Sequence, residues 1–246
     1  AGAEPRRRCA GAGREGRRIK GVTATSGPTA VPITISGPKV GRSSTNIVCI
    51  CASSNLSRAW QNAEQAAELV RGKLEIMVLD SLTTSTGLGL LALAAAEAVA
   101  TGASAEEATR VVRMRIPNIY AIFFLETMQY LQHSSRVDTS QAKLAAMLGV
   151  KPIIALESGA LIPFEKVRTR TQALERLIEF ASEFPHIEQL AVLRGRARVA
   201  SAARQLRSRV ADAYPDARIT NAIFGPALAD MVGPDGLGII LCEASD

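Results

Sequence analysis

The stretch NIVCICASSNLSRAW, residues 46–60, carries the clearest signal for the fold. Its first part, 46–53, is a run of β-branched and small apolar side chains that predicts a buried strand. Cys49 and Cys51 lie two residues apart in this run, so we expect both on one face of the strand, buried as small apolar side chains. A pair of serines ends the strand, and residues 60–71 then predict a helix closed by a glycine.

The same strand-then-helix pattern follows once more along the chain. The run LEIMVLDS (74–81) predicts a second buried strand, and residues 87–101 predict an Ala/Leu-rich helix. A third helix is expected to begin at Ser104, because Glu107 completes a capping box with it, and to end near Arg115. Strands that alternate with helices favour parallel pairing through right-handed crossovers, which is the arrangement of an open α/β sheet.

The pattern changes after Pro117, where hairpins mix with helices. The elements predicted there are a strand at 119–126, a helix at 139–148, a hairpin at 151–167 that turns at 157–159, a helix at 170–184, a strand at 187–195, a helix at 196–214, and strands near 217–224 and 237–242. This mixture indicates an α+β unit.

The chain as a whole is predicted to be an α/β protein of two domains. An N-terminal α/β sandwich with a mainly parallel sheet is expected over residues 23–116, and a C-terminal α+β domain over 117–246. Residues 1–22 form a basic tail whose role the sequence does not indicate. A ligand is expected between the two domains, where small-molecule sites often lie.

Composition excludes several classes of function. Of the net charge of +6, residues 1–20 carry +5, so the rest of the chain is not expected to bind nucleic acid. The longest apolar segment, 88–99, contains Glu97 and is too short for a transmembrane segment. The basic tail has no apolar core of a signal peptide, so we expect a cytoplasmic protein. The four cysteines fit no metal-binding spacing, and no metal is expected.

Hydroxyl side chains gather where the predicted strands end. At the carboxyl end of a parallel strand the next helix presents unpaired N–H groups and the positive end of its dipole, which together favour an anion. Ser54 and Ser57 would add uncharged donors that suit a carboxylate, although Ser54 also fits the simpler role of a helix cap. Two further clusters are Thr23, Thr25 and Ser26 at a Gly-Pro turn, and Asp80, Ser81, Thr83, Thr84, Ser85 and Thr86 after the second strand.

The last cluster leaves a second interpretation open. Gly87 and Gly89 loosely resemble the dinucleotide-binding fingerprint, and Asp80 is either a general base or a turn cap. These residues would suit a small-molecule transferase that binds phosphate at the helix terminus. The fingerprint is weak here, because its glycines should stand in the tight turn itself.

Catalytic motifs are otherwise missing from the sequence. His133 and His186 are the only histidines, and they assemble no Ser-His-Asp triad. No zinc motif or phosphate-binding P-loop occurs either. Arg168 and Arg170, at a strand-to-helix junction, could bind an acidic partner or form surface ion pairs. Hydroxyls without a base, a metal or a cofactor describe a carrier better than an enzyme.

Several stretches together resemble the DegV family of bacterial fatty-acid-binding proteins. They are TSGPT (25–29), ASSNLSRAWQNA (52–63), VLDSLTTSTGLGLLALAAAE (78–97), ETMQYLQHSSRV (126–137), KPIIALESGALIPFEKVRTRTQAL (151–174) and GPDGLGI (233–239). They occur in the order of the family's motifs and cover residues 23–240.

The resemblance implies a non-enzymatic protein whose two domains enclose a long-chain acyl tail. Hydroxyls would hold the carboxylate, and the ligand-binding positions expected here are Thr25, Ser26, Ser53, Ser54, Ser57 and Arg58. Family members can present the fatty acid to a separate kinase that makes an acyl phosphate for phospholipid synthesis. A fatty acid kinase is therefore a possible partner, and Arg168 and Arg170 are the expected contact residues.

The sequence departs from the family pattern at several places. The family's first strand, with its D-S-x-x-D-L-P motif, has no counterpart in the basic tail. Arg58 and Ala59 replace a Gly-Thr pair, and residues 134–135 are serines where the family has two glycines. Met231 stands where a histidine of the head-group network is expected. This last change predicts binding without support for acyl transfer, and a relative that has lost its ligand altogether is a third hypothesis.

Overall fold

The computed structural model describes residues 22–25, 46–130 and 149–244. The strands in these ranges are β1 (Val22–Thr25), β2 (Asn46–Cys51), β3 (Glu75–Asp80), β4 (Ile119–Phe124), β5 (Lys151–Glu157), β6 (Ala160–Val167), β7 (Ile187–Arg194), β8 (Arg218–Ile223) and β9 (Leu237–Glu243). The helices are α1 (Ala59–Leu69), α2 (Ser85–Ala100), α3 (Ala105–Arg115), α6 (Arg170–Ser182), α7 (Ala200–Ala213) and α8 (Pro226–Val232), with 3-10 turns η1 (Ile116–Asn118) and η2 (Ala197–Val199).

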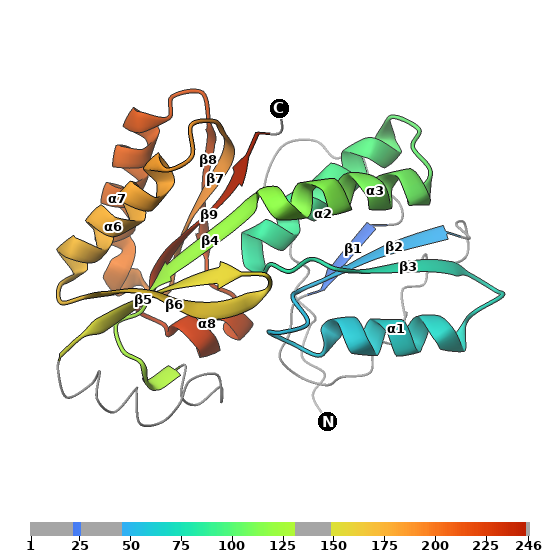
Figure 1. Ribbon diagram of the computed structural model, residues 1–246, viewed down its shortest axis with the longest axis horizontal. Helices are drawn as coiled ribbons and strands as arrows, with labels where there is room; N and C mark the ends of the chain where they lie inside the picture. The colour runs from blue at the N-terminus through green and yellow to red at the C-terminus, as the bar shows by residue number, and fades with distance from the viewer. Residues whose placement is uncertain (1–21, 26–45, 131–148, 245–246) are drawn as a thin grey trace.

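The first sheet has three parallel strands in the order β1-β2-β3. Helix α1 covers one face, and α2 and α3 cover the other (Figure 1). Alternation along β2 explains this layering: Val48 and Ile50 pack with α2 and α3, whereas Cys49 and Cys51 pack beneath α1. The predictions of parallel pairing between β2 and β3, of the helices α1, α2 and α3 and of two buried cysteines on one face are confirmed.

Capping residues in the sequence predicted the start of α3 correctly, but strand β1 was missed. The capping box of Ser104 and Glu107 is present at the start of α3, with the Glu107 carboxylate accepting from Ser104 N–H at 2.7 Å. Strand β1 was not predicted, because four residues before a Gly-Pro turn carry too little periodicity. Its backbone becomes a strand through pairing with β2.

The second sheet has six strands in the order β6-β5-β4-β9-β7-β8. All neighbours pair antiparallel except β7 and β8, which α7 connects as a parallel pair. The hairpin predicted at 151–167 is confirmed, with Ser158 and Gly159 at its tip. Helix α8 was not predicted, since its seven residues span less than two full repeats of an apolar stripe. The helix predicted at 139–148 lies outside the described residues.

Both faces of this second sheet are apolar. Along β4, Ile122 and Phe124 face the cluster covered by α6 and α7, and Ala121 and Phe123 face the opposite cluster. Strands buried on both sides read as unbroken apolar runs, which is why 119–126 gave a strong strand signal. Helix α8 packs on the second face, which also receives Leu56 from the loop after β2.

The two sheets are joined through α2, which packs against β4 and β9 of the second sheet as well as the first (Figure 1). The carboxyl ends of β2 and β3 point toward the second sheet. None of the helices in the described part of the chain combines the length and the apolar character needed to cross a membrane.

Candidate ligand-binding site

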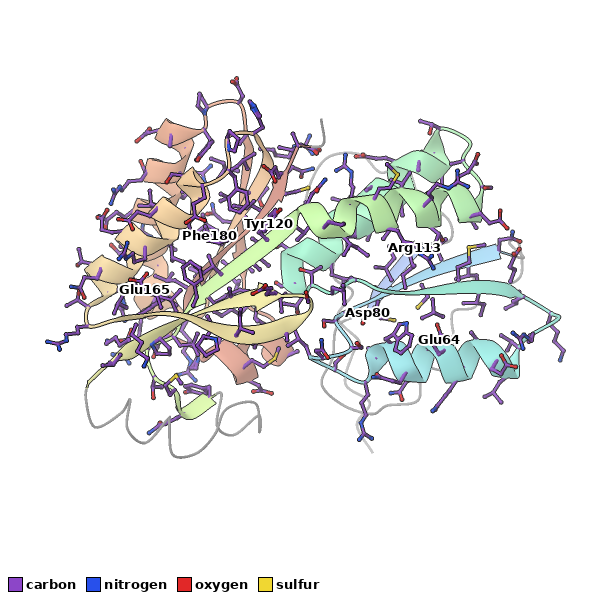
Figure 2. The ribbon with its side chains drawn as sticks, in the orientation of Figure 1. Glu64, Asp80, Arg113, Tyr120, Glu165 and Phe180 are labelled. Carbon is purple, nitrogen blue, oxygen red and sulfur yellow. The ribbon has the colours of Figure 1, made fainter. Side chains whose placement is uncertain are left out.

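The carboxyl ends of the first three strands share one edge of their sheet. The register aligns Cys51 of β2 with Asp80 of β3 and with Thr25 of β1, so the backbone leaves all three strands at the same level. Figure 2 shows Asp80 where the first sheet faces the second. The hydroxyl clusters after β2 and β3 therefore meet at this edge, and the backbone of Thr25 lies there too. Ser26 lies outside the described residues.

Asp80 holds the two loops together. Its Oδ1 accepts hydrogen bonds from the N–H groups of Ser54 and Leu82, each at 3.1 Å, and its Oδ2 also accepts from Ser54 at 3.2 Å. The Ser53 N–H donates to the Thr83 carbonyl at 2.9 Å. Asp80 therefore caps turns, one of the two roles that the sequence left open. Its oxygens accept from backbone donors that keep the loops in register.

Ser53 fastens this edge to the second sheet. Its hydroxyl is buried and donates to the carbonyl of Gly159, at the tip of the β5–β6 hairpin, over 2.6 Å. The Asn55 N–H donates to the Ser53 hydroxyl at 3.2 Å, and the Asn55 side-chain amide donates to the Ser158 carbonyl at 3.2 Å. Gly159 has a φ of 80°, and a Cβ there would collide with the Ser53 hydroxyl. Ser53 thus positions the loop after β2, and its hydroxyl proton is used in the bond to Gly159.

Two threonine hydroxyls at the start of α2 lack hydrogen bonds. Thr83 Oγ1 and Thr86 Oγ1 are buried, and no partner for either occurs in the described ranges. Thr84, the N-cap of α2, makes no side-chain capping bond to the first-turn N–H groups. A buried hydroxyl without a partner costs about 1–3 kcal/mol, so two of them beside an uncapped helix start call for an acceptor that satisfies both.

Backbone strain is concentrated at the same edge. Among the described residues, the non-glycine residues with positive φ are Leu82 at 49°, Ser85 at 53° and Ser158 at 48°. Leu82 and Ser85 directly precede the unpartnered Thr83 and Thr86, and Ser158 is in the hairpin tip that contacts Asn55. Left-handed non-glycine residues are uncommon and tend to mark functional sites, which strengthens the case for this edge.

The remaining predicted ligand-binding residues lie on the loop into α1. Ser54 and Ser57 are half-buried, and the Ser57 hydroxyl accepts from the Ala59 N–H at 3.2 Å. Arg58 is the formal N-cap of α1, makes no side-chain cap and is exposed. The capping role that the sequence suggested for Ser54 is thus carried by Ser57. The sequence named Thr83 and Thr86 within a hydroxyl cluster but gave no reason to select them.

The two glycines of the weak dinucleotide fingerprint lie inside α2, not in the turn that precedes it. Gly87 is buried because the Thr83 side chain and Ile119 occupy the space where its Cβ would lie. Around Gly89 that space is open. Close packing therefore explains Gly87, and the fingerprint geometry is not reproduced.

A family model described as "uncharacterised protein, DegV family" matches residues 20–244 of the chain. The chain belongs to the DegV family. Protein DegV of Bacillus subtilis is 28% identical to it over 224 residues, which make up 89% of this chain and 78% of the Bacillus protein. The resemblance that the motifs indicated is confirmed.

Solved DegV structures share the fold. The crystal structure of DegV from Bacillus subtilis, described as a fatty acid binding protein, has a TM-score of 0.71 at 28% identity and covers 83% of this chain and 73% of that one. A DegV family protein from Eubacterium eligens loaded with heptadecanoic acid has a TM-score of 0.73 at 17% identity, covering 83% and 75%. The fatty acid kinase B3 protein of Streptococcus pneumoniae, loaded with linoleic acid, has 0.72 at 17%, covering 82% and 73%. At 17% identity these last two support the fold alone.

An apolar cluster lies next to the hydroxyl edge of this DegV-family chain. Leu56, on the loop between Ser53 and α1, is buried among the side chains that cover the α8 face of the second sheet. Met231 is in the same cluster and is 7% exposed. The position where the family resemblance predicted a histidine therefore holds an apolar side chain in apolar surroundings, with no proton to transfer.

The two arginines predicted to bind a partner differ in their surroundings. Arg168 is exposed, whereas Arg170, the first residue of α6, donates to Glu126 Oε2 at 2.8 Å. Lys151 forms a second ion pair with Glu126. Burial opposes ionisation of Glu126, but the hydrogen bonds from both cations outweigh it and lower the pKa of this carboxyl. Arg170 is therefore engaged within the fold, and Arg168 is the more accessible of the two.

No cluster of three or more His, Cys, Asp or Glu side chains in the described ranges could hold a metal ion. A groove of about 520 Å³ lies at the opposite end of the first sheet, near the starts of β2 and β3. Charged residues line much of it, among them Glu64, Glu68, Arg71 and Lys73. Such a lining does not suit an acyl chain, so the hydroxyl edge is the better candidate site.

Proposed function

We propose that this DegV-family protein binds a long-chain fatty acid as a carrier and leaves it chemically unchanged. The observation that carries the proposal is the pair of buried, unpartnered hydroxyls of Thr83 and Thr86 at the uncapped start of α2. A carboxylate would accept from both hydroxyls and from the helix N–H groups, and the helix dipole favours its charge. The description of Bacillus subtilis DegV as a fatty acid binding protein supports the same ligand.

The proposed head-group site combines these threonines with the serines predicted from the sequence. Ser54 and Ser57 are half-buried at the same edge and would add donors from the other loop. Thr25 and Ser26 stay predictions of the motif resemblance, as does Arg58. We assign Ser53 a supporting role, because its hydroxyl proton is donated to the hairpin tip.

The acyl tail is proposed to follow the apolar cluster that contains Leu56 and Met231. That path would run between two domains divided near residues 116 and 117, as the sequence predicted. Each buried methylene contributes about 0.8 kcal/mol, so sixteen carbons supply ample driving force even after the costs of association. The carboxylate contacts would then serve orientation and specificity more than affinity.

We further propose a fatty acid kinase as the partner that receives the ligand. A protein of the same fold, the fatty acid kinase B3 protein, suggests this step, and exposed Arg168 offers a contact for an acidic surface. Met231 in place of the expected histidine leads us to propose binding without efficient acyl phosphate formation.

The first experiment is native mass spectrometry of the purified protein, followed by extraction and identification of released lipid. A stoichiometric fatty acid is expected. A protein that is empty and also fails to take up oleate or palmitate would refute the proposal, and binding of nucleotides instead would favour the phosphate-binding transferase.

The hydroxyl site is tested with the isosteric variants Thr83→Val and Thr86→Val. Removing an unsatisfied buried hydroxyl should leave stability unchanged or raise it, yet remove a hydrogen bond to the carboxylate. Each variant should lose about tenfold or more in oleate affinity, since bonds to charged groups are worth about 1.5–3 kcal/mol.

Thr109→Val is the matched control for these variants. Thr109 is also buried, but its hydroxyl lies on α3 and contacts the Met77 sulfur at 3.2 Å. Its replacement should leave affinity unchanged. Equal affinity losses in all three variants would indicate a general effect on packing and would contradict the assignment.

A further inference from the structure

Two thiols lie side by side directly before the proposed ligand site. Cys49 and Cys51 are both on the α1 face of β2, with their sulfur atoms 3.8 Å apart. They are 8% and 0% exposed and both carry thiols in this structure. The chain turns out of the sheet two residues later, at Ser53.

The helix that covers this pair buries few of its own side chains. Ala59 and Ala63 are the buried residues of α1, the smallest buried set of any α-helix in the described ranges. Its N-cap, Arg58, makes no side-chain cap, and neither end carries a charge that complements the dipole. With two small buried residues of its own and no charge at either end that complements its dipole, α1 can open locally and admit a small molecule to the thiols.

The surroundings of Cys49 favour the reactive form of its sulfur more than those of Cys242 do. A hydrogen bond from Cys51 lowers the pKa of the Cys49 thiol, against burial and the nearby Glu64, which both act to raise it. Burial raises the pKa of Cys242, on the central strand β9. The thiolate is the reactive form of cysteine, so Cys49 is a better nucleophile than Cys242.

We propose that Cys49 and Cys51 form a reversible disulfide when the protein meets hydrogen peroxide, and that this disulfide weakens ligand binding at residues 53–57. The second half rests on the proposed function. The Cys49 thiolate attacks one peroxide oxygen, the O–O bond breaks, and a sulfenic acid and water form once the leaving oxygen takes a proton. The Cys51 sulfur then attacks the oxidised sulfur, the S–O bond breaks, and a second water leaves.

Closing this bond must bend the end of β2. Alternate residues of a strand have Cα atoms about 6.6 Å apart, at the upper limit of what a disulfide spans. The sulfurs must approach from 3.8 Å to bonding distance. The Cys51 carbonyl accepts from the Ser81 N–H at 3.0 Å, so a bend there disturbs both loops of the site. A strained disulfide is also easily reduced, which makes the change reversible.

The sequence provides separate readouts for the chemistry and for its effect. Tryptic cleavage after Arg42 and Arg58 releases residues 43–58, which contain both cysteines of the pair and no other. Disulfide formation removes two hydrogen atoms, about 2 Da, from that peptide. Trp60, the only tryptophan of the chain, packs against the buried cluster that contains the pair, so its fluorescence should report the oxidation without any lipid.

The experiment treats the full chain with hydrogen peroxide and follows peptide mass, Trp60 fluorescence and oleate affinity, before and after dithiothreitol. We expect the mass loss, a fluorescence change and about tenfold weaker binding, all restored by the reductant. Cys49→Ser and Cys51→Ser should each abolish the mass loss, and Cys242→Ser should retain it. A second variant of each, Cys49→Ala and Cys51→Ala, covers the case in which serine is not accommodated.

The possible results separate the two proposals. No mass loss, or oxidation of Cys242 as fast as of the pair, overturns the disulfide. A disulfide with unchanged oleate affinity overturns the regulation. If reduced protein binds no oleate, the proposed function fails and the regulatory half fails with it, while mass and fluorescence still decide the disulfide.

Discussion

Replacing Ser53 and Ser54 by alanine, one at a time, should separate stability from ligand binding. Ser53 is fully buried and makes two hydrogen bonds through its hydroxyl, to the Gly159 carbonyl and from the Asn55 N–H. Ser53→Ala removes both bonds and leaves the buried Gly159 carbonyl without its side-chain donor, whereas Asn55 is exposed. Together these losses cost about 2–3 kcal/mol. In a chain of this size that lowers the melting temperature by roughly 4–12 °C.

Ser54 is the matched control, one residue further on. Its hydrogen bonds with Asp80 run through the backbone N–H, which alanine retains, and the described residues offer its hydroxyl no partner. Ser54→Ala should therefore change stability by less than about 0.5 kcal/mol. If the carboxylate accepts from this hydroxyl, oleate affinity falls by about tenfold.

Thermal unfolding and urea titration measure the first effect, and displacement of a fluorescent fatty acid measures the second. Ser53→Ala should bind with near-normal affinity where it is folded, once the folded fraction is taken into account. The reasoning is refuted if Ser53→Ala unfolds like the wild type, or if Ser54→Ala loses stability while keeping full affinity. The first result would remove the structural role assigned to Ser53, and the second would give Ser54 a structural role in place of ligand binding.

Two further predictions concern packing and charge. Gly87→Ala should lower the free energy of unfolding by about 1–2 kcal/mol, because its Cβ would collide with the Thr83 side chain. Gly89→Ala has open space around the new Cβ and should raise the free energy of unfolding by up to about 1 kcal/mol. Urea titration measures both changes, and equal effects would contradict the packing account. Glu126→Gln should cost about 1 kcal/mol at neutral pH by removing two ion pairs. Since the folded-state pKa of Glu126 lies below its usual value of 4.5, this difference should persist at pH 5–8 and vanish as pH falls through that lower pKa; a difference that grows in acid would contradict the ion-pair account.

Much of the fold follows from short-range patterns in the chain. The parallel strands β2 and β3 and the helices α1, α2 and α3 that follow them were predicted from apolar runs and capping residues. Apolar period and caps act over a few residues, so a single sequence suffices to read them. Strand β1 and helix α8 were missed because neither is long enough to show a period, and each is stabilised by what it packs against.

The candidate site was predicted only in outline. The sequence placed hydroxyls at the ends of β2 and β3, and parallel pairing brings those ends together at Cys51 and Asp80. It could not tell which hydroxyls are satisfied. Ser53, taken for a ligand contact, donates to a residue 106 positions away. Thr83 and Thr86, named only as part of a cluster, have buried hydroxyls for which the described residues provide no partner.

By itself, then, the sequence determined most of the secondary structure, the parallel pairing of β2 and β3 and the edge where their hydroxyl clusters meet, because these depend on periodicity and on the direction in which strands run. The tertiary structure decided which side chains on that edge remain available. Hydrogen-bond satisfaction depends on groups brought together from distant parts of the chain, as Gly159 is to Ser53. Local sequence does not show which distant groups will pair, so whether a donor is available to a ligand is known only once the chain has folded.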